Sequence, residues 1–422
     1  MGGPSTRRAA ADRARRRTWW WRRQGLAPGA SPRTIEACVR RAGWLPTAGG
    51  PGVYLTVRAR MPRVSREAID RAAVDGTPLV EVPGPHARPP VLVPRQDMAL
   101  ALRLHGTSYD RHLAAYLRSG HIDPAAIRRL GSAICRALDE GPLSSADVRK
   151  RVQHAGDVSL LAGVLVHLCL HGTIRRFPAN ARLDSPKYCY ELLHPDDRPN
   201  LDAEGEEPAI AQRVVERYLR WHGPATVDEI CTWSELPRKT ARAALEALGA
   251  TVVTRDEPRG ESWLLPQDAP AWHTFDGDDA PHVALLPYRD PLVAAHRPLT
   301  VMTEVPDATV LRDGHEIRLG DASVLHHHTV VSGGEIVGIW EYDPDPREVV
   351  TRLWTSNRRL AALAAEAAAE AGRFIREQLG DAKLSAVDPP AARATRIAFC
   401  RAGSRTSRIA GARNHAASSS RT

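Results

Sequence analysis

The sequence predicts an α+β protein made of tandem winged helix-turn-helix domains, a small C-terminal β-barrel and a long C-terminal helix. One set of elements occurs twice between residues 124 and 270: a helix, a Gly-Pro turn, a Ser- or Thr-capped helix, a third helix and two strands. This order is typical of the winged helix, and its duplication strengthens the prediction. Short β-like runs with Asp-Gly and Gly-Gly turns follow between residues 280 and 345, which indicates the barrel.

The elements of the two copies can be assigned along the chain. In the first copy, residues 124–195, helices are expected at 124–138, 144–152 and 158–171. In the second copy, residues 208–270, they are expected at 208–221, 226–233 and 237–248. An acidic linker, residues 196–207, separates the copies.

The flanking regions have different patterns. Residues 1–21 are predicted to be a basic disordered arm, and residues 22–123 an N-terminal winged-helix-like region. Within that region, alternation of Val53, Leu55 and Val57 with more polar neighbours indicates a short strand or an extended start to the next element. The C-terminal helix is expected at residues 346–380, and a disordered basic tail at 385–422.

The formal net charge of +9 is concentrated at the two ends of the chain. Residues 1–25 hold eight arginines and one aspartate, and residues 386–422 hold seven arginines and one aspartate. These ends carry +7 and +6, so the remaining chain carries −4. Bulk charge alone therefore does not establish binding to a nucleic acid, although it permits it.

Composition also limits the partners and the compartment. No stretch approaches the roughly 18 apolar residues of a membrane span, so the protein is not expected to cross a membrane. We also expect a cytoplasmic location and a monomer. The six cysteines are far apart in sequence, which argues against a zinc or dithiol site. On a strand, His326 and His328 would share one face while His327 points away, and no cysteine is near. Neither a metal nor a cofactor is expected.

Basic side chains within the predicted winged-helix repeats and the N-terminal winged-helix-like region are candidates for contacts with double-stranded DNA. The helix at 237–248 carries three near its N-terminal end, where a helix-turn-helix faces a groove; the alternative is a solvated basic face. Adjacent strand residues face opposite sides, so at most one of Arg175 and Arg176 would face a given partner. The full candidate set is Arg58, Arg60, Arg149, Lys150, Arg175, Arg176, Arg238, Lys239 and Arg242.

Several short segments, in this order, resemble the AlkZ-like family of winged-helix DNA glycosylases. They are RRQGL at 22–26, the block 43–60, VPRQD at 93–97, LLPYRDP at 285–291 and VVSGGEIVGIWEYD at 330–343. The last two are the most specific, because they are typical of the C-terminal β-barrel of that family. The resemblance implies tandem winged helices and a barrel around duplex DNA, with hydrolysis of the N-glycosidic bond of alkylated or crosslinked purines.

The resemblance also implies a catalytic motif, which this sequence lacks. The family uses a glutamine, one spacer residue and then a glutamine or aspartate; the matching positions here are Pro46, Thr47 and Ala48. Pro46 and Ala48 cannot orient a water through their side chains, and Thr47 occupies the spacer position. Four other polar residues could supply the function if the fold brought them together: His86, Gln96, Asp97 and Asp290.

Three hypotheses therefore remain open from the sequence. The first is a DNA-binding member of this superfamily, with glycosylase activity not established. The second is a non-catalytic winged-helix transcriptional regulator. The third is a protein-interaction platform, which the acidic balance of the middle of the chain allows.

Overall fold

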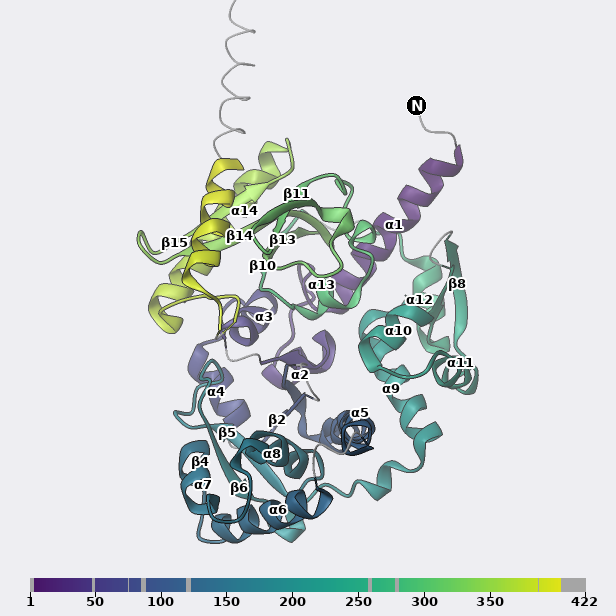
Figure 1. The fold of residues 1–422 in the computed structure, drawn as a ribbon. Helices are drawn as coiled ribbons and strands as arrows, with labels where there is room; N and C mark the ends of the chain where they lie inside the picture. Colours follow the sequence, from purple (N-terminus) through teal and green to yellow (C-terminus); the bar gives the residue numbers. More distant parts are fainter. Residues whose placement is uncertain are drawn as a thin grey trace, which may run out of the picture. The chain divides into compact units, whose positions relative to one another are not determined.

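The structure, a computed structural model, describes residues 4–47, 50–74, 76–84, 89–118, 123–256, 260–277, 281–385 and 387–403 (Figure 1). The chain divides into two compact units. Unit 1 contains Met1–Arg33, Gly50–Arg66 and Pro270–Thr422, and unit 2 contains Thr34–Gly49 and Glu67–Ala269. Within the described ranges, no helix has both the length and the apolar character needed to cross a bilayer.

Unit 2 contains two stretches with the same element order and the same strand order. The first consists of α6 (Pro124–Leu138), β4 (Leu143–Ser144), α7 (Ser145–Val152), α8 (Leu161–Leu170), β5 (Ile174–Pro178) and β6 (Tyr188–Leu192). The second consists of α9 (Glu207–His222), β7 (Ala225–Thr226), α10 (Val227–Ser234), α11 (Arg238–Ala247), β8 (Thr251–Asp256) and β9 (Gly260–Leu264). In each sheet the first and second strands both pair with the third, giving β4-β6-β5 and β7-β9-β8.

Equivalent polar side chains begin the second helix of each repeat. The Ser144 hydroxyl accepts a hydrogen bond from the amide of Asp147. Thr226 does the same for Glu229, whose carboxylate accepts in turn from the Thr226 amide and completes a capping box. Each cap satisfies an amide that the helix leaves without a partner, which explains why these boundaries are visible in the sequence.

The same element order occurs a third time along the chain, in residues 35–94, although the helix Gly52–Arg60 belongs to unit 1 and the strands belong to unit 2. It comprises α2 (Ile35–Ala42), β1 (Leu45–Pro46), α3 (Gly52–Arg60), α4 (Arg66–Val74), β2 (Leu79–Val82) and β3 (Val91–Pro94), with strand order β1-β3-β2. The strand predicted around Val53, Leu55 and Val57 is wrong, because α3 is helical there. All residues from Val53 to Val57 are buried, so the apparent alternation does not separate a buried face from a solvated one.

Two further features complete unit 2. The long helix α5 (Met98–Arg118) follows the 35–94 segment and packs against α8 and α9. Trp44, Trp221 and Trp233 pack their rings together in the core that α5 joins, with centroids between 5.4 and 5.6 Å apart. The predicted acidic linker contains two short 3-10 turns, Pro195–Asp197 and Asp202–Glu204.

Unit 1 is built on an open four-stranded antiparallel sheet. Its strands are β10 (Val283–Leu286), β13 (His328–Ser332), β14 (Glu335–Asp343) and β15 (Glu348–Leu353), in the order β10-β13-β14-β15. A separate hairpin pairs β11 (Thr309–Arg312) with β12 (His315–Arg318). The barrel predicted for 280–345 is not observed, because β10 and β15 do not pair and no described strand closes the sheet.

Helices cover the edges of this sheet. Helix α14 (Arg358–Phe374) lies against β10 and β15 and continues as a π-helical turn at Ile375–Leu379 (Figure 1). The helix predicted for 346–380 is therefore wrong at its start, since Glu348–Leu353 pairs with β14 as a strand. Two short helices, α12 (Ala269–Thr274) and α13 (Pro291–Ala295), flank β10 in sequence.

The basic ends are folded over much of their length, contrary to prediction. In α1 (Pro4–Arg23), Arg17 and the three tryptophans 19–21 are buried, and Arg17 forms an ion pair with Glu304. Residues 390–403 are also helical, and Arg393 and Arg396 are buried there. The carboxylates of Asp381, Glu341 and Asp388 neutralise these two arginines. Residues 404–422 of the predicted tail lie outside the described residues.

Candidate active site

Thr47, the middle one of the three positions that the sequence resemblance assigns to a catalytic motif, directly follows β1 and is completely buried. Its amide donates a hydrogen bond to the carbonyl of Pro90 at 2.9 Å, which fixes the backbone beside β3. The Thr47 hydroxyl donates to Oε1 of Glu81. Pro46 pairs with Val91 within the sheet, and Ala48 lies outside the described residues.

Glu81 is an unusual residue for its place in the fold. It lies in β2, where all four residues are buried, and it retains only 7% of its possible exposure. A carboxylate is rarely buried this far without partners, because burial removes its hydration. Besides the hydrogen bond from Thr47, Oε1 accepts one from the Arg176 guanidinium at 3.2 Å and one from the Tyr188 hydroxyl at 3.3 Å. Oε2 is buried and has no hydrogen-bond partner among the described residues.

Arg176 and Tyr188 come from adjacent strands of the 124–192 repeat. Arg176 lies directly opposite Tyr190, and Tyr188 lies two residues before Tyr190 on the same strand. The side chains of Arg176 and Tyr188 therefore project from the same face of the sheet. The Arg176 guanidinium carbon lies 4.3 Å from the centroid of the Tyr188 ring. This cation–π contact holds the guanidinium in place beside Glu81.

The cluster shifts the pKa values of the two groups that bind Glu81 alongside Thr47. Burial would lower the pKa of Arg176, but attraction to Glu81 and smaller contributions from nearby groups raise it overall. Burial and then the Glu81 charge raise the pKa of the Tyr188 hydroxyl, so the phenol stays protonated and donates to the carboxylate. The arrangement is a carboxylate whose Oε1 accepts from three side chains and whose buried Oε2 has no hydrogen-bond partner among the described residues.

Several predicted DNA-binding residues are engaged within the protein instead. The guanidinium of Arg60 is completely buried and bound to Asp290, so the prediction of a DNA contact there is wrong. Arg176 is likewise committed to Glu81, with only 11% of its side chain exposed. Arg175 pairs with Glu191 and lies against the Phe177 ring. The sequence contains no local signal for these pairings, because each connects residues from different elements.

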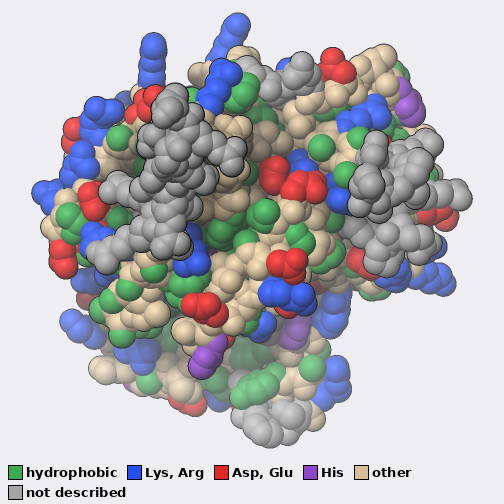
Figure 2. Space-filling view, turned by 90° about the horizontal axis from the view of Figure 1, so that it is seen from above, with side chains coloured by type: hydrophobic (Ala, Val, Ile, Leu, Met, Phe, Trp, Pro, Cys, Tyr) green, Lys and Arg blue, Asp and Glu red, His purple; other side chains and the backbone are tan. Residues whose placement is uncertain are grey.

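The other candidates are more accessible. Arg58 is partly buried, with its guanidinium 5.1 Å from the centroid of the Phe374 ring. The exposed candidates are Arg149 and Lys150 on α7, and Arg238, Lys239 and Arg242 on α11. Arg238 forms an ion pair with exposed Asp228. On the face drawn in Figure 2, basic and acidic side chains are interspersed, in line with the modest net charge outside the chain ends.

The alternative polar residues named from the sequence do not form the cluster around Thr47. Asp97 is buried and bound by Arg217 at 3.0 Å and by the Trp44 indole at 3.3 Å. Gln96 is exposed, and His86 lies outside the described residues. Glu81 was not among the residues predicted from the sequence, although it carries a local signal as the one charged residue in the otherwise apolar run LVEV. Because β2 is buried on both faces, an acidic residue within it is a candidate for a catalytic or binding role.

The histidine run lies in the interior of unit 1. His327 and His328 are both buried, and His327 Nε2 accepts from the Leu311 amide at 3.0 Å. His328 Nδ1 accepts from the Tyr288 amide, and its ring stacks on Trp340 at a centroid distance of 4.2 Å. Desolvation lowers the pKa of both imidazoles, so they are neutral packing groups. His326 is partly exposed.

Residues 39–376 match the family described as DNA glycosylase AlkZ-like. This match spans most of the chain, and the protein belongs to the AlkZ-like DNA glycosylase family.

A solved structure supports the same fold. The DNA glycosylase AlkZ of Streptomyces sahachiroi is similar with a TM-score of 0.64 and 20% sequence identity, over 88% of this chain and 98% of that chain. At this identity the likeness concerns the fold alone. No curated protein sequence matches the chain.

Proposed function

We propose that this chain binds double-stranded DNA and hydrolyses the N-glycosidic bond of alkylated or crosslinked purines. The three repeats, each ordered helix, strand, helix, helix, strand, strand, support an assignment as tandem winged helices. Such domains place a helix in the major groove and a β-hairpin against the backbone. Exposed basic side chains near the start of α11 are the best-placed candidates for that contact.

The observation that carries the catalytic proposal is the Glu81 carboxylate, which Thr47 binds at the position of the family motif. An alkylated purine already carries positive charge, so it leaves readily once the sugar is stabilised. In the proposed step, a water oxygen bonds to the sugar C1′ while the C1′–N bond breaks and its electron pair stays with the base. The water proton passes to Oε2 of Glu81, the oxygen without a protein partner.

The other members of the cluster act as positioning residues in this proposal. Thr47, Arg176 and Tyr188 all bind Oε1, which leaves a single oxygen to orient the water. Arg176 also places a positive charge beside the carboxylate, with its guanidinium 3.2 Å from Oε1. Negative charge on Glu81 would additionally stabilise an oxocarbenium-like sugar.

The test is release of a methylated purine from duplex DNA, followed by alkali to reveal abasic sites. The wild-type chain should produce alkali-labile sites, and Glu81→Gln should reduce the rate at least about 100-fold, as expected for loss of a general base. Glu191→Gln is the matched control, because Glu191 is also paired with an arginine of the same sheet but lies outside the cluster. Its rate should stay close to wild type.

Two outcomes would contradict the proposal in different ways. Duplex binding without any abasic sites in the wild-type protein would eliminate the enzyme and leave a DNA-binding protein. Equal rates for wild type and Glu81→Gln would retain the enzyme but remove Glu81 from its mechanism. A reduced rate in Glu81→Gln counts for the proposal only if this variant and the wild type unfold at the same temperature.

A non-catalytic transcriptional regulator is the second candidate. The observation that favours it is the Arg176–Glu81 ion pair, because a buried carboxylate with a cationic partner can serve structure alone. Sequence-selective protection of promoter DNA in footprinting, with no base release, would support the regulator. Protection that follows damaged bases regardless of sequence would support the glycosylase.

A further inference from the structure

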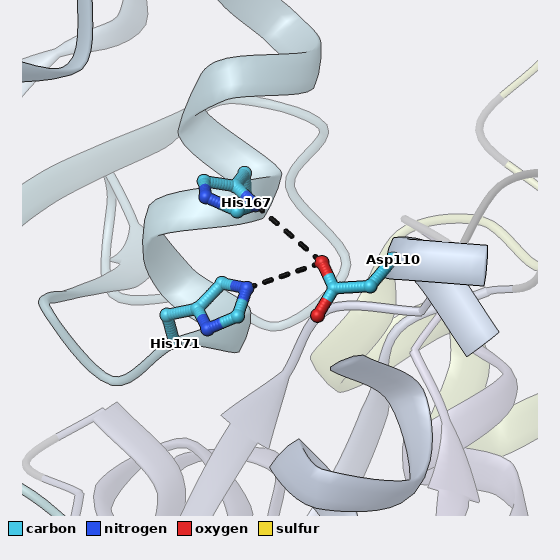
Figure 3. Close-up of side chains that lie close together, drawn as sticks. All are labelled: Asp110, His167 and His171. Atoms are coloured by element: carbon cyan, nitrogen blue, oxygen red, sulfur yellow. Dashed lines mark hydrogen bonds and ion pairs between the residues drawn. The ribbon is translucent and has the colours of Figure 1, made fainter. Parts of the chain in front are cut away.

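Two histidines and an aspartate of unit 2 converge on one point between α5 and α8 (Figure 3). His167 lies on α8 and His171 caps the end of that helix, one turn later. A spacing of four residues places both side chains on the same face of a helix, and the ring centroids are 4.2 Å apart. Asp110 reaches this face from α5.

The distances within the cluster are short enough for a shared ligand. Oδ1 of Asp110 lies 3.8 Å from Nδ1 of His167 and 3.2 Å from Nε2 of His171. These three atoms all lie within 4.8 Å of one another. A tetrahedral zinc ion with bonds of about 2.0–2.1 Å separates its ligand atoms by roughly 3.4 Å, so small rotations suffice.

Neighbouring contacts hold the two helices at this separation. The hydroxyl of Tyr109, adjacent to Asp110, donates a hydrogen bond to the carbonyl of Gly163 on α8 at 2.9 Å. Nδ1 of His167 is buried and makes no hydrogen bond to a described residue, although it faces Asp110. A donor atom left without a hydrogen bond beside a carboxylate is what a metal ligand requires.

We propose that Asp110, His167 and His171 form a site for a divalent transition-metal ion of the zinc class. Imidazole nitrogens favour zinc, cobalt, nickel and copper, whereas magnesium and calcium require more oxygen ligands. Three protein ligands leave a fourth position for water. The side chains remain 29–47% exposed, so solvent reaches the cluster.

The geometry assigns this ion a role in joining two parts of unit 2. Asp110 lies on α5, whereas both histidines lie in the 124–192 repeat that also supplies Arg176 and Tyr188 to the candidate active site. A bound ion would therefore fix α5 against that repeat. The metal site does not depend on the proposed glycosylase activity, since none of its residues belongs to the Glu81 cluster.

The experiment titrates the metal-free full-length chain with Co²⁺ and Zn²⁺. Cobalt should give the visible d–d absorption of a four-coordinate site with nitrogen and oxygen ligands, at one ion per chain, and zinc should displace it. Asp110→Asn and His171→Gln should each weaken binding at least about tenfold, the usual effect of losing one ligand or its orienting partner. They should also abolish the rise in unfolding temperature that zinc gives the wild-type protein.

The chain has 17 histidines, so a control must exclude general surface binding. His194→Ala serves this purpose, because His194 is an exposed histidine 3.5 Å from the carboxylate of Asp196, without a second imidazole in that pair. It should bind cobalt as tightly as wild type. Unfolding temperatures measured in chelator identify any variant that fails to fold; Asp110→Asn changes only one atom and keeps the shape of the side chain.

The proposal is overturned if the Asp110→Asn and His171→Gln variants, folded in chelator, bind zinc as tightly as wild type. It is also overturned by intense thiolate-to-cobalt charge-transfer absorption, which would place the ion on cysteine instead. A wild-type chain that binds no cobalt at millimolar concentration would likewise refute it.

Discussion

Arg60 and Asp290 form a two-point ion pair in the interior of unit 1, with N–O distances of 2.8 and 3.0 Å and no exposure of either side chain. Gln24 completes the set, because its carbonyl and side-chain oxygens accept from the same guanidinium at 3.0 and 2.8 Å. Asp290 also caps α13 through the Leu292 amide. Three segments far apart in sequence thus meet at one cation.

This pair leads to a stability prediction. Asp290→Ala should lower the free energy of unfolding by about 3–5 kcal/mol, because it leaves a buried guanidinium without its counter-charge. Urea unfolding followed by tryptophan fluorescence measures the loss. Arg312→Ala is the control: it removes a half-exposed arginine of the same unit whose nearest carboxylate, Asp313, is 3.9 Å away, and should cost less than about 1 kcal/mol. Equal losses would contradict a structural role for the pair.

The helix at 390–403 gives a second prediction. Arg396 is buried and paired with Glu341 and Asp388, whereas Arg401 is half-exposed and paired with Asp343 and Glu348. Arg396→Ala should therefore lower the unfolding temperature far more than Arg401→Ala, because Arg396 is buried between two buried carboxylates, whereas Arg401 is half-exposed and one of its two partners, Glu348, lies at the surface. Differential scanning calorimetry of both variants decides the matter. Similar small shifts would mean that the helix does not contribute to the folded core.

The two buried histidines predict how stability depends on pH. Burial, with smaller effects from Arg396, His326 and Arg352, lowers the pKa of His327 to about 3, and the pKa of His328 is well below its ordinary value. In the unfolded chain both histidines take up a proton near pH 6.5, so above that pH their contribution to the free energy of unfolding is fully present. It is lost as pH falls, at about 1.4 kcal/mol per pH unit for each histidine.

Glu341 acts in the opposite direction over part of this range. Burial, opposed by Arg396, raises its pKa to about 7, so the folded state binds the proton first and its contribution grows as pH falls from 7 to 4.5. His327→Gln should make the decline between pH 6.5 and 4.5 shallower by about 1.4 kcal/mol per pH unit, since glutamine can still accept from Leu311 but does not titrate. Urea midpoints across this range measure the change, and an unaltered slope would refute the prediction.

Duplex affinity tests the exposed end of α11. Arg238→Ala combined with Arg242→Ala should weaken binding, because both side chains are exposed at the helix end predicted to meet DNA. Removal of two phosphate contacts should also reduce the slope of log affinity against log salt by about two. Fluorescence anisotropy at several salt concentrations measures both quantities.

The control for this experiment removes two arginines from α9 of the same repeat. Arg213 and Arg220 pair with Glu204 and Glu216, and their joint replacement by alanine changes the net charge by the same amount. An equal loss of affinity in both double variants would mean that total charge, rather than α11, determines binding. Unchanged affinity in the α11 variant would remove this helix from the interface.

The sequence alone determined the order of the three helices and the last two strands of each copy in residues 124–270, because the signals that mark them are local; the short strands β4 and β7 were not predicted. Ser144 and Thr226 cap helices through amides three residues away, so a short window contains both partners. The sequence was misleading where consecutive residues are all buried, because hydrophobic periodicity then carries no information about the element. At Val53 to Val57 every side chain is inside, and apolar alternation then no longer distinguishes a strand from a helix.

The candidate site was decided by tertiary structure. Thr47 and Glu81 are 34 residues apart and Arg176 is 95 residues beyond Glu81, so only the packed sheets bring them together. The same holds for Arg60, Arg393 and Arg396, which the sequence counts as surface charge and the fold places against carboxylates. Ion pairs and hydrogen bonds depend on distances of a few ångströms in space, whereas the sequence gives only the separation of residues along the chain. Partners that are far apart in sequence can therefore be found only in the folded structure.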